Sequence, residues 1–394
     1  MKRRFLFHTL KKYIDHKNAL IITGMRQVGK TTLMQQLFNE VDEPKLWFDF
    51  DNPLDMIQFE EIDYNKIFQN LEKTINSKGK RIFIFIDEIQ NLPEITKIIK
   101  YHIDHYNVKY IVTGSSNFYL KNLFPESLSG RKFLFVLPPL SFMEYLYFHN
   151  KLEVNNPTKN DFSNIIQQQN RTEYEKRSAD YSNFVEFGGF PEVVLTEDTE
   201  TKKTVLKNIF ASFFEKDIKV LADIKDIREL RDLILMLVPR TGNILDVTRL
   251  SAELGINRVK TYNYLEFLQG VFFMELVPKF SKNIDRSVAG GKKVYFADTG
   301  ILNIIGKVNE GQLFENAVAN QLKEYGTLSY YNQRNTAEID FVLNKEIAFE
   351  VKINATAKDL KRTTYLAEKL GISETYLISK KYNEIDRTIF PAFL

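Results

Sequence analysis

The strongest chemical signal in the sequence is the glycine-containing segment 24–31, GMRQVGKT, which fits the phosphate-binding pattern G-x-x-x-x-G-K-[ST]. The apolar run 19–23 before it predicts a buried strand, and the apolar spacing after it predicts a helix. Glycines let backbone N–H groups surround a phosphate at a helix N-terminus, where a lysine adds positive charge. A chance Gly-containing turn before Lys-Thr is disfavoured by the flanking elements. The residues expected to bind the nucleotide here are Gly24, Arg26, Gln27, Val28, Gly29, Lys30, Thr31 and Thr32.

Two carboxylates follow a second apolar run. Residues 81–86 are β-branched or aromatic, too few for a helix, and are followed by Asp87 and Glu88. Ligands bind at the carboxyl ends of strands in open α/β sheets. We therefore expect Thr31 and Asp87 to hold Mg²⁺ and Glu88 to polarise the water that attacks ATP. Asp-Glu after a strand is alone often only a charge pair at a helix N-terminus, but beside the glycine loop ATP hydrolysis is the favoured interpretation.

Further strands are expected at 45–51, 109–114 and 132–136, alternating with helical segments. This alternation predicts an α/β fold with a parallel sheet covered by helices on both faces, over residues 1–140. Ser115 and Ser116 follow one of these strands. They either place a hydroxyl near the γ-phosphate or cap the next helix.

Composition is that of a large enzyme of two to four domains, with 394 residues and a net charge of +3. The chain has no cysteine, which excludes disulfides, thiolate zinc sites and a cysteine nucleophile. The basic start is followed by an apolar run too short for a signal peptide, and no apolar segment reaches spanning length, so a cytoplasmic protein without a membrane partner is expected. His102 and His105 share a helix face but do not make a metal site, and we expect both on the solvated surface.

The middle of the chain predicts a helical lid or linker region at 141–227, followed by a winged helix at 228–291. Residues 151–182 are polar and rich in Asn and Gln, as in a linker or an exposed helix. Helices expected at 246–254 and 257–269 flank the turn 255–257, a helix-turn-helix pattern.

Basic residues gather on this predicted winged helix, which favours contact with the phosphates of double-stranded DNA. On the third helix, Arg258, Lys260, Tyr262 and Asn263 are expected to be exposed, with Val259, Leu265 and Leu268 inside. The wing contributes Lys279, Lys282, Arg286, Lys292 and Lys293 against one acid, Asp285. The alternative is a wing that contacts another protein domain and serves as a hinge.

Near the C-terminus, residues 338–343 and 346–352 alternate like two strands joined by a tight turn. This hairpin places Asp340 opposite Glu350, with Lys352 on the same face. Facing carboxylates repel unless a cation lies between them, which a shared Mg²⁺ would provide. Without a metal, Asp340→Asn would be expected to raise stability. Glu315, near the start of a predicted helix, could add a carboxylate. The alternative is a solvated charged face.

Several of these segments together resemble AAA+ ATPases of bacteria and archaea that carry a nuclease-like C-terminal region. The matching segments are GMRQVGKTTL at 24–33, IDEIQ at 86–90, TGSS at 113–116, LSGR at 128–131 and PLSFME at 139–144. Residues 188–191, GGFP, are similar to a signature of the STAND-type branch. The resemblance implies that Ser115 and Ser116 sense the γ-phosphate. It also implies that Arg131 stabilises the transferring charge from a neighbouring subunit, although an ordinary surface arginine is an equal alternative.

The C-terminal pattern resembles the PD-(D/E)XK nuclease fold, here assigned to residues 292–394. The resemblance maps onto Glu315, Asp340, Glu350 and Lys352 as the catalytic set, with Asp340 and Glu350 as metal ligands. The departure is that Ile339, not proline, precedes Asp340.

The expected function is an ATP-driven switch that couples nucleotide state to a DNA-binding winged helix and a nuclease-like module. One alternative is a nucleotide-gated binding protein whose nuclease-like domain is inactive and docks a protein partner. Another is a signalling ATPase that does not bind DNA. The sequence leaves the oligomeric state open.

Overall fold

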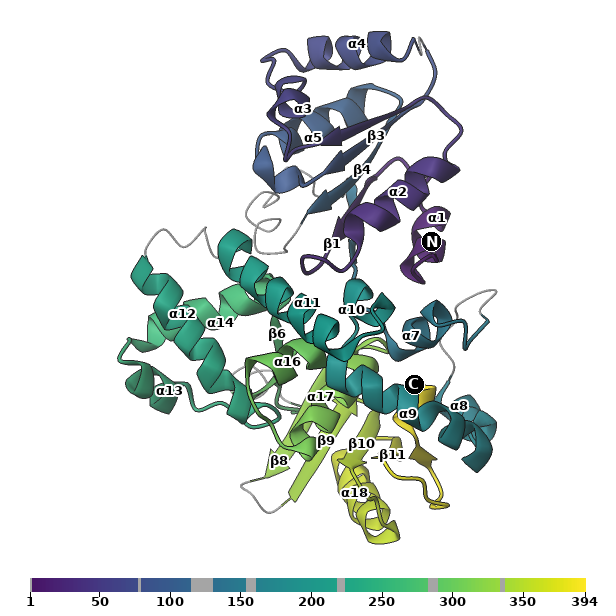
Figure 1. The fold of residues 1–394 in the computed structure, drawn as a ribbon, viewed down its shortest axis with the longest axis vertical. Helices are drawn as coiled ribbons and strands as arrows, with labels where there is room; N and C mark the ends of the chain where they lie inside the picture. The colour runs from purple at the N-terminus through teal and green to yellow at the C-terminus, as the bar shows by residue number, and fades with distance from the viewer. Residues whose placement is uncertain are drawn as a thin grey trace. The chain divides into compact units, whose positions relative to one another are not determined.

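The computed structural model describes residues 2–76, 79–114, 130–153, 161–217, 224–282, 290–333 and 337–394. The chain divides into two compact units (Figure 1). The first comprises Met1–Pro138 with Gly270–Phe272, and the second comprises Pro139–Gln269 with Phe273–Leu394. The domain boundaries expected at 140, 227 and 291 stay predictions.

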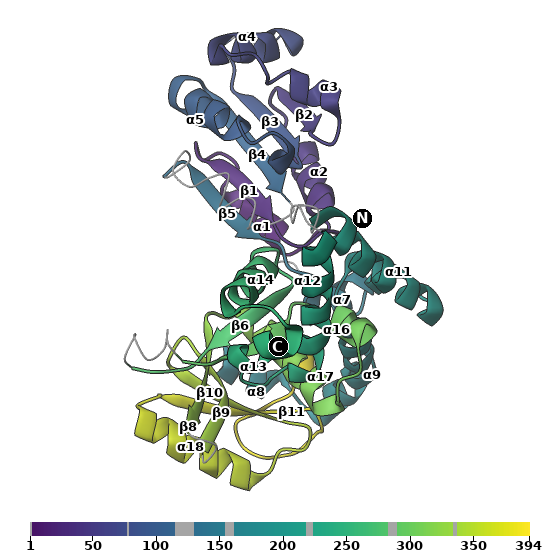
Figure 2. The ribbon, with the colours of Figure 1, turned by 90° about the vertical axis from the view of Figure 1, so that its left-hand side faces the viewer.

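The first unit contains a five-stranded sheet in the order β2-β3-β4-β1-β5, with every neighbouring pair parallel (Figure 2). The predicted parallel sheet is therefore confirmed. The strand that carries Asp87 and the strand that enters the glycine loop are separated by one strand, β4. The strands are β1 (Ala19–Thr23), β2 (Lys45–Asp49), β3 (Ile82–Asp87), β4 (Val108–Gly114) and β5 (Lys132–Val136).

Helices cover both faces of this sheet. Alternate side chains of β3 pack against helices on opposite sides. Ile84 packs with Ile67 of α4 and Ile98 of α5, whereas the ring of Phe85 meets that of Phe38 in α2 edge-on at 5.1 Å. The helical segments of this unit are α1 (Leu6–Lys12), α2 (Lys30–Glu40), α3 (Pro53–Ile57), α4 (Tyr64–Thr74), η1 (Ile89–Asn91) and α5 (Ile95–His105).

His102 corrects the expectation of a solvated surface residue, because its side chain is fully buried on α5. Its Nε2 lies 2.8 Å from the carbonyl oxygen of Tyr64, which can only accept, so Nε2 carries the proton. Its Nδ1 then accepts from the hydroxyl of Tyr110 at 2.6 Å. Burial lowers the pKa of His102 to about 4, so the folded protein holds this ring neutral.

This neutral histidine predicts a loss of stability on acidification. The unfolded chain takes up the proton near pH 6.5 and the folded chain only near pH 4, so the free energy of unfolding should fall by about 3 kcal/mol across that window. Chemical denaturation from pH 7 to 4 should show a flatter profile for His102→Gln than for the parent. His105→Gln on the same helix is the control and should keep the parent's profile. Identical slopes for the parent and His102→Gln would contradict the assignment.

Helices in the first part of the second unit share one hydrophobic core with the C-terminal sheet. Phe162, Ile165 and Tyr181 lie in this core together with Phe341 and Phe349. The segment 151–182, expected as a linker or an exposed helix, therefore contains core-forming helices. The elements of this part are α7 (Phe142–Phe148), α8 (Phe162–Gln168), α9 (Arg171–Phe187), α10 (Pro191–Leu195), α11 (Thr199–Ser212) and a π-helical turn, Phe213–Asp217.

Three helices and a two-stranded antiparallel sheet occupy the region of the predicted winged helix. They are α12 (Ile224–Leu237), α13 (Val247–Leu254), α14 (Arg258–Gly270), β6 (Met274–Pro278) and β7 (Lys292–Phe296), with a 3-10 turn at Val238–Arg240. Gly255 ends α13 in the left-handed region at φ 68°. Residues 241 and 244, between α12 and α13, each form a bridge to β7.

The surface of α14 differs in part from the expected one. Val259, predicted to pack inside, is 70% exposed. Lys260 is engaged by Asp226 at 2.5 Å and Glu229 at 2.6 Å, so its charge is balanced within the unit.

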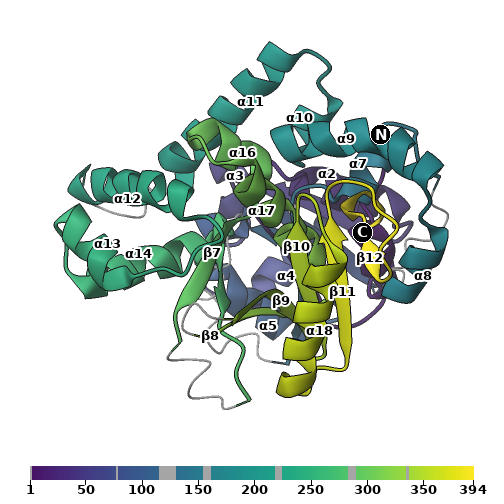
Figure 3. The same ribbon diagram turned by 90° about the horizontal axis from the view of Figure 1, so that it is seen from below.

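The C-terminal sheet has the order β12-β11-β10-β9-β8, antiparallel from β8 to β10 and parallel from β10 to β12. Phe314 and Val318 of α17 lie in a core with Phe349, whereas Ala367 of α18 packs with Ala348, so the two helices cover opposite faces (Figure 3). The elements are α16 (Thr299–Ile305), α17 (Glu310–Lys323), β8 (Leu328–Gln333), β9 (Ala337–Leu343), β10 (Ile347–Lys352), α18 (Ala357–Leu370), β11 (Glu374–Ser379), β12 (Thr388–Ile389) and η5 (Pro391–Phe393).

None of the helices in the described ranges combines the length and the apolar character that crossing a membrane requires.

Candidate functional site

The glycine loop connects β1 to α2 as predicted, and its backbone needs glycine at two positions. Gly24 has φ 148°, and a Cβ there would lie 2.2 Å from the carbonyl oxygen of Leu137. Gly29 precedes the first residue of α2 in the left-handed region at φ 93°. Any other residue at Gly24 would clash with main-chain atoms, so the loop conformation is tied to the sequence pattern.

Lys30 is folded onto the loop that it follows. Its ammonium donates to the carbonyl oxygens of Gly24 at 3.1 Å and Met25 at 2.8 Å, and the side chain is buried. A phosphate bound in the loop would offer this ammonium a charged acceptor in place of neutral carbonyls, which makes the exchange favourable.

Arg4 braces the same loop and was not identified from the sequence. Its guanidinium donates to the carbonyl oxygens of Val28 and Pro138, both at 2.8 Å, and the side chain is buried. The only sequence signal was a basic start, which is also common in solvated termini. The arginine therefore links the phosphate loop to Pro138, the residue after which the chain enters the second unit.

Asp87 lies at the end of β3 and is bonded from two sides. The hydroxyl of Thr31 donates to its Oδ2 at 2.6 Å, and the hydroxyl of Thr113 donates to its Oδ1. The fold thus brings together the two residues predicted to hold Mg²⁺, Thr31 and Asp87. An oxygen donor set of one hydroxyl and one carboxylate, with the phosphates of ATP, suits this ion.

Glu88 follows Asp87 in the left-handed region at φ 52°. Its carboxylate accepts from the side-chain amide of Gln90, and its backbone N–H donates to Asp87 Oδ1 at 3.1 Å. The two adjacent acids therefore have different side-chain partners, Thr31 and Thr113 for Asp87 and Gln90 for Glu88.

Thr113, near the end of β4, lies beside Asp87 and was not identified from the sequence, which pointed to the two serines that follow this strand. Because Ile86 pairs with Val112, the next residue, Thr113, lies next to Asp87. Ser115 and Ser116 lie outside the described residues. The register between β3 and β4 places Thr113 beside Asp87, and a single sequence does not show the register between two separate strands.

Removing the Thr113 hydroxyl should slow ATP turnover without preventing binding. Thr113→Val leaves Asp87 Oδ1 with one donor fewer, and loss of such an orienting partner typically lowers activity about 10- to 100-fold. Steady-state ATP hydrolysis and nucleotide titration would measure the two effects separately. The control is Thr96→Val, which alters another buried threonine of the same unit. Equal turnover in the Thr113 variant and the parent would remove the residue from the site.

Arg131 lies at the amino-terminal end of β5, whereas the glycine loop follows the carboxyl-terminal end of its neighbour β1. It directly precedes β5, whose first residue pairs with Ala19, whereas Thr23 at the loop end pairs with Val136. Four strand residues separate these ends by about 13 Å. The guanidinium forms an ion pair with Asp104 at 2.6 Å and lowers the pKa of that carboxyl. A role at a nucleotide is therefore open to Arg131 only from a neighbouring subunit.

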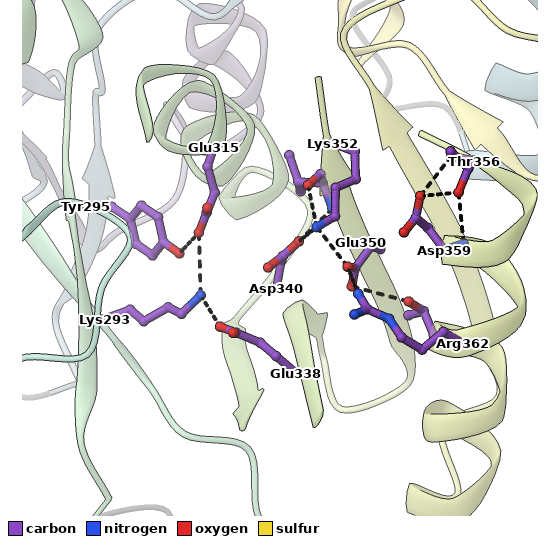
Figure 4. Close-up of polar contacts among 12 residues, drawn as sticks. Lys293, Tyr295, Glu315, Glu338, Asp340, Glu350, Lys352, Thr356, Asp359 and Arg362 are labelled. Atoms are coloured by element: carbon purple, nitrogen blue, oxygen red, sulfur yellow. Dashed lines mark hydrogen bonds and ion pairs between the residues drawn. The ribbon is translucent and has the colours of Figure 1, made fainter. Parts of the chain in front are cut away.

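The second candidate site lies where β9 and β10 stop pairing. Regular pairing ends at Phe341 with Phe349, one residue short of the predicted pair of Asp340 and Glu350. Asp340 Oδ2 instead accepts the backbone N–H of Val351 at 2.8 Å. Lys352 Nζ lies 2.8 Å from Glu350 Oε1 and 3.4 Å from Asp340 Oδ2, so it contacts both carboxylates (Figure 4).

Helix α18 supplies two further partners of Glu350. Arg362 forms an ion pair with its Oε1, and the hydroxyl of Thr363 donates to its Oε2 at 3.2 Å (Figure 4). Neither residue was identified from the sequence. Burial, followed by the charge of Asp340, raises the pKa of Glu350, while Lys352 and Arg362 oppose this rise.

Glu315 joins the cluster through residues of β7. Its Oε1 accepts from the hydroxyl of Tyr295 at 2.6 Å and lies 3.5 Å from Lys293 Nζ (Figure 4). The same ammonium lies 2.7 Å from Glu338. Burial would lower the pKa of Lys293, but the carboxylates around it, Glu315 first, outweigh burial and raise it.

Lys293 corrects the expectation of a wing residue that contacts DNA phosphates. The side chain is 3% exposed, and its ammonium forms ion pairs with Glu315 and Glu338. In the sequence, an alternating basic segment gave no sign that one lysine turns inward.

The electrostatic argument for a metal also changes. In the described part of this cluster, Lys293, Lys352 and Arg362 face four carboxylates, those of Glu315, Glu338, Asp340 and Glu350. The chain's own cations therefore offset part of the expected repulsion, and the gain in stability expected for Asp340→Asn stays a prediction. Within the described ranges, no three His, Asp or Glu side chains gather as a metal-binding group. Asp340 and Glu350 remain the carboxylates that could share an ion, together with substrate and water.

Comparison with known proteins identifies the class of the first unit. Residues 16–146 match an AAA domain, residues 178–312 a domain of unknown function (DUF8612) and residues 310–392 another domain of unknown function (DUF4143). Since the five-stranded parallel sheet and the glycine loop lie in the first match, the chain carries an AAA-type P-loop ATPase domain. The fold of this domain implies a nucleotide-binding site.

The chain also has relatives that match it over most of its length, and one solved structure has a similar fold. An uncharacterized protein of Haemophilus influenzae is 28% identical over 410 residues, covering 98% of this chain and 94% of the relative. An uncharacterized protein of Methanocaldococcus jannaschii is 27% identical over 387 residues, covering 92% and 82%. A Walker-type ATPase of Pyrococcus abyssi has a similar fold, with a TM-score of 0.50 at 16% identity over 77% of this chain and 95% of that one.

Proposed function

We propose that the protein is an ATP-hydrolysing AAA+ enzyme that couples its nucleotide state to a DNA-binding winged helix and a metal-dependent nuclease-like domain. The observation that carries the second half of this proposal is the cluster at the end of β9 and β10. It joins two carboxylates, Asp340 and Glu350, to the ammonium of Lys352.

The ATPase half rests on the glycine loop, Thr31, Asp87 and Glu88. Mg²⁺ would be held by Thr31 and Asp87 and would neutralise the charge that develops on the phosphates. Glu88, the residue after Asp87, would polarise the attacking water. Gly24, Arg26, Gln27, Val28, Gly29, Lys30 and Thr32 complete the nucleotide contacts of the proposal.

The nuclease-like half is supported by the order of elements as well as by the cluster. A helix bearing Glu315 is followed by β8, the β9–β10 hairpin, a second helix and a parallel strand, the arrangement expected of a PD-(D/E)XK fold. Asp340 and Glu350 would hold the ion, which when bound supplies a hydroxide nucleophile. Lys352 contributes positive charge beside the phosphate that is cut.

DNA binding by residues 228–291 is supported by three helices followed by a two-stranded sheet. Of the cations expected on the third helix and the wing, Arg258, Lys282 and Lys292 are exposed and remain candidates for phosphate contacts, whereas Lys279 is half-buried. Lys260 and Lys293 are excluded by their ion pairs, and Arg286 lies outside the described residues.

A second function is favoured by one specific observation. Lys293, Lys352 and Arg362 form ion pairs with carboxylates of the cluster. A domain balanced in this way could dock a protein partner in response to ATP and have no chemistry of its own.

Divalent-dependent DNA cleavage separates these two functions. Supercoiled, linear, branched and single-stranded DNA should be incubated with Mg²⁺ or Mn²⁺, with and without ATP. Cleavage of any substrate that depends on the divalent ion supports the nuclease-like function. If no substrate is cut in any nucleotide state, the docking function stands.

A further inference from the structure

Helix α18 carries a basic stripe on its outer face. The buried and half-buried residues, among them Thr363 and Ala367, face the sheet. Residues 358, 362, 365 and 369 are spaced four, three and four apart, so they align along one side of the helix, and residue 361 lies next to them. The exposed side chains of the stripe are Lys358, Lys361, Arg362, Tyr365 and Lys369.

The three lysines of the stripe form no ion pair with any acid in the described part of the chain. Two exposed lysines on other helices differ in this respect, because Lys97 pairs with Glu94 and Lys176 with Glu173, each three residues earlier. On α18, Lys369 instead lies 4.2 Å from the ring centroid of Tyr365. The stripe therefore presents three ammonium groups without an ion pair around one exposed aromatic ring, with the exposed acid Glu368 at its border.

The stripe is continuous with the carboxylate cluster at one side and with another lysine at its end. Arg362 forms the ion pair with Glu350 described above. A Cβ on Gly371, just after α18, would lie 3.0 Å from the ammonium of Lys282, which places that cation at the helix C-terminus. From residue 358 to residue 369 the helix rises about 16 Å, enough to follow two or three consecutive phosphates of one strand.

We propose that this stripe binds the phosphate backbone of double-stranded DNA and holds it beside Asp340 and Glu350. The proposal rests on the proposed nuclease-like function and adds the surface that would hold its substrate. A row of point charges suits a row of phosphates, and the ring of Tyr365 can pack against a sugar. A membrane surface is a poorer occupant, because an interfacial helix also needs a broad apolar face outside, and Tyr365 is the one large apolar side chain of α18 that is exposed.

Charge reversal tests the surface with a matched control. The stripe variant combines Lys358→Glu, Lys361→Glu and Lys369→Glu. The control combines Lys207→Glu, Lys216→Glu and Lys307→Glu, three exposed lysines of the same unit, and changes net charge equally. Binding of a fluorescent duplex of about two helical turns should be measured by anisotropy, without divalent ions, over a series of salt concentrations. Unchanged ATP hydrolysis and melting temperature would establish that both variants fold.

The stripe variant is expected to bind the duplex at least about tenfold more weakly than the control. The slope of log affinity against log salt should also become shallower by about two to three. Tyr365→Ala should weaken binding without changing this slope. If the stripe variant matches the control in affinity and slope, the surface is not used for DNA. If the parent binds no duplex, or binds only vesicles containing phosphatidylserine, the inference is likewise overturned.

Parallel cleavage and Mn²⁺-binding measurements keep this inference apart from the proposed function. If the parent cuts DNA while the stripe variant binds and cuts as the control does, the inference fails and the nuclease-like function stands. If duplex binding depends on the stripe but no DNA is ever cut, the inference stands and the nuclease-like function fails.

Discussion

Replacing Lys30 with alanine is expected to abolish ATP binding and hydrolysis. The ammonium is buried at the loop and bonded to two loop carbonyls, so it is already positioned where a phosphate would bind. Loss of a charged hydrogen-bond partner in such a site costs about 3 kcal/mol, a factor of roughly a hundred in affinity. Calorimetric titration with ATP and Mg²⁺, together with phosphate release, would measure the loss.

Two variants show whether the loss is specific. Lys17→Ala removes an exposed lysine of the same unit and should leave both readouts unchanged. Glu88→Gln should keep ATP binding and lose turnover, because it removes the base and leaves Thr31 and Asp87 in contact. Unchanged ATP hydrolysis in Lys30→Ala would contradict the assignment of the nucleotide site.

Replacing Asp340 or Lys352 with alanine is expected to abolish metal-dependent DNA cleavage. Asp340 is the member of the cluster that contacts both Lys352 and the main chain of β10. Removing a preorganised charged group from a site of this kind lowers turnover by on the order of a thousandfold. Nicking of supercoiled DNA in Mn²⁺ would measure this loss, and Mn²⁺ binding would distinguish Asp340, a proposed ligand, from Lys352, which is not one.

The matched control is Glu346→Ala, which removes an exposed carboxylate from the turn of the same hairpin. It should cut DNA and bind Mn²⁺ as the parent does. Equal cleavage by the parent and Asp340→Ala would place the chemistry elsewhere in the chain or outside it.

The sequence was most informative where chemistry and secondary structure are local. The glycine loop lies between a strand and a helix only a few residues away, and Asp87 ends its own strand, so spacing along the chain was enough. The hairpin that carries Asp340 and Glu350 was predicted for the same reason, because its two strands are separated by only a short turn. In the structure, residues 344 and 345 of this turn both adopt positive φ.

Residues from distant segments were missed because their types are ordinary at a surface. Arg4, Lys293 and Arg362 are basic side chains in polar stretches, and only the fold shows that each binds a partner more than ten residues away. His102 was misplaced for a related reason. Its partners, Tyr64 and Tyr110, lie on another helix and on a strand, so its burial depends on packing that helix periodicity does not specify.

The most direct test of the central claim is the nicking of supercoiled DNA by the parent, Glu88→Gln and Asp340→Ala, each in Mn²⁺ with ATP, with ADP and without nucleotide. Coupling predicts a rate for the parent that differs between nucleotide states. Glu88→Gln should bind ATP without hydrolysing it, so in ATP its nicking rate should remain that of the ATP-bound state. Asp340→Ala should not nick DNA. Nicking by Asp340→Ala at the parent's rate, or a parent that nicks no DNA in any nucleotide state, would contradict the claim.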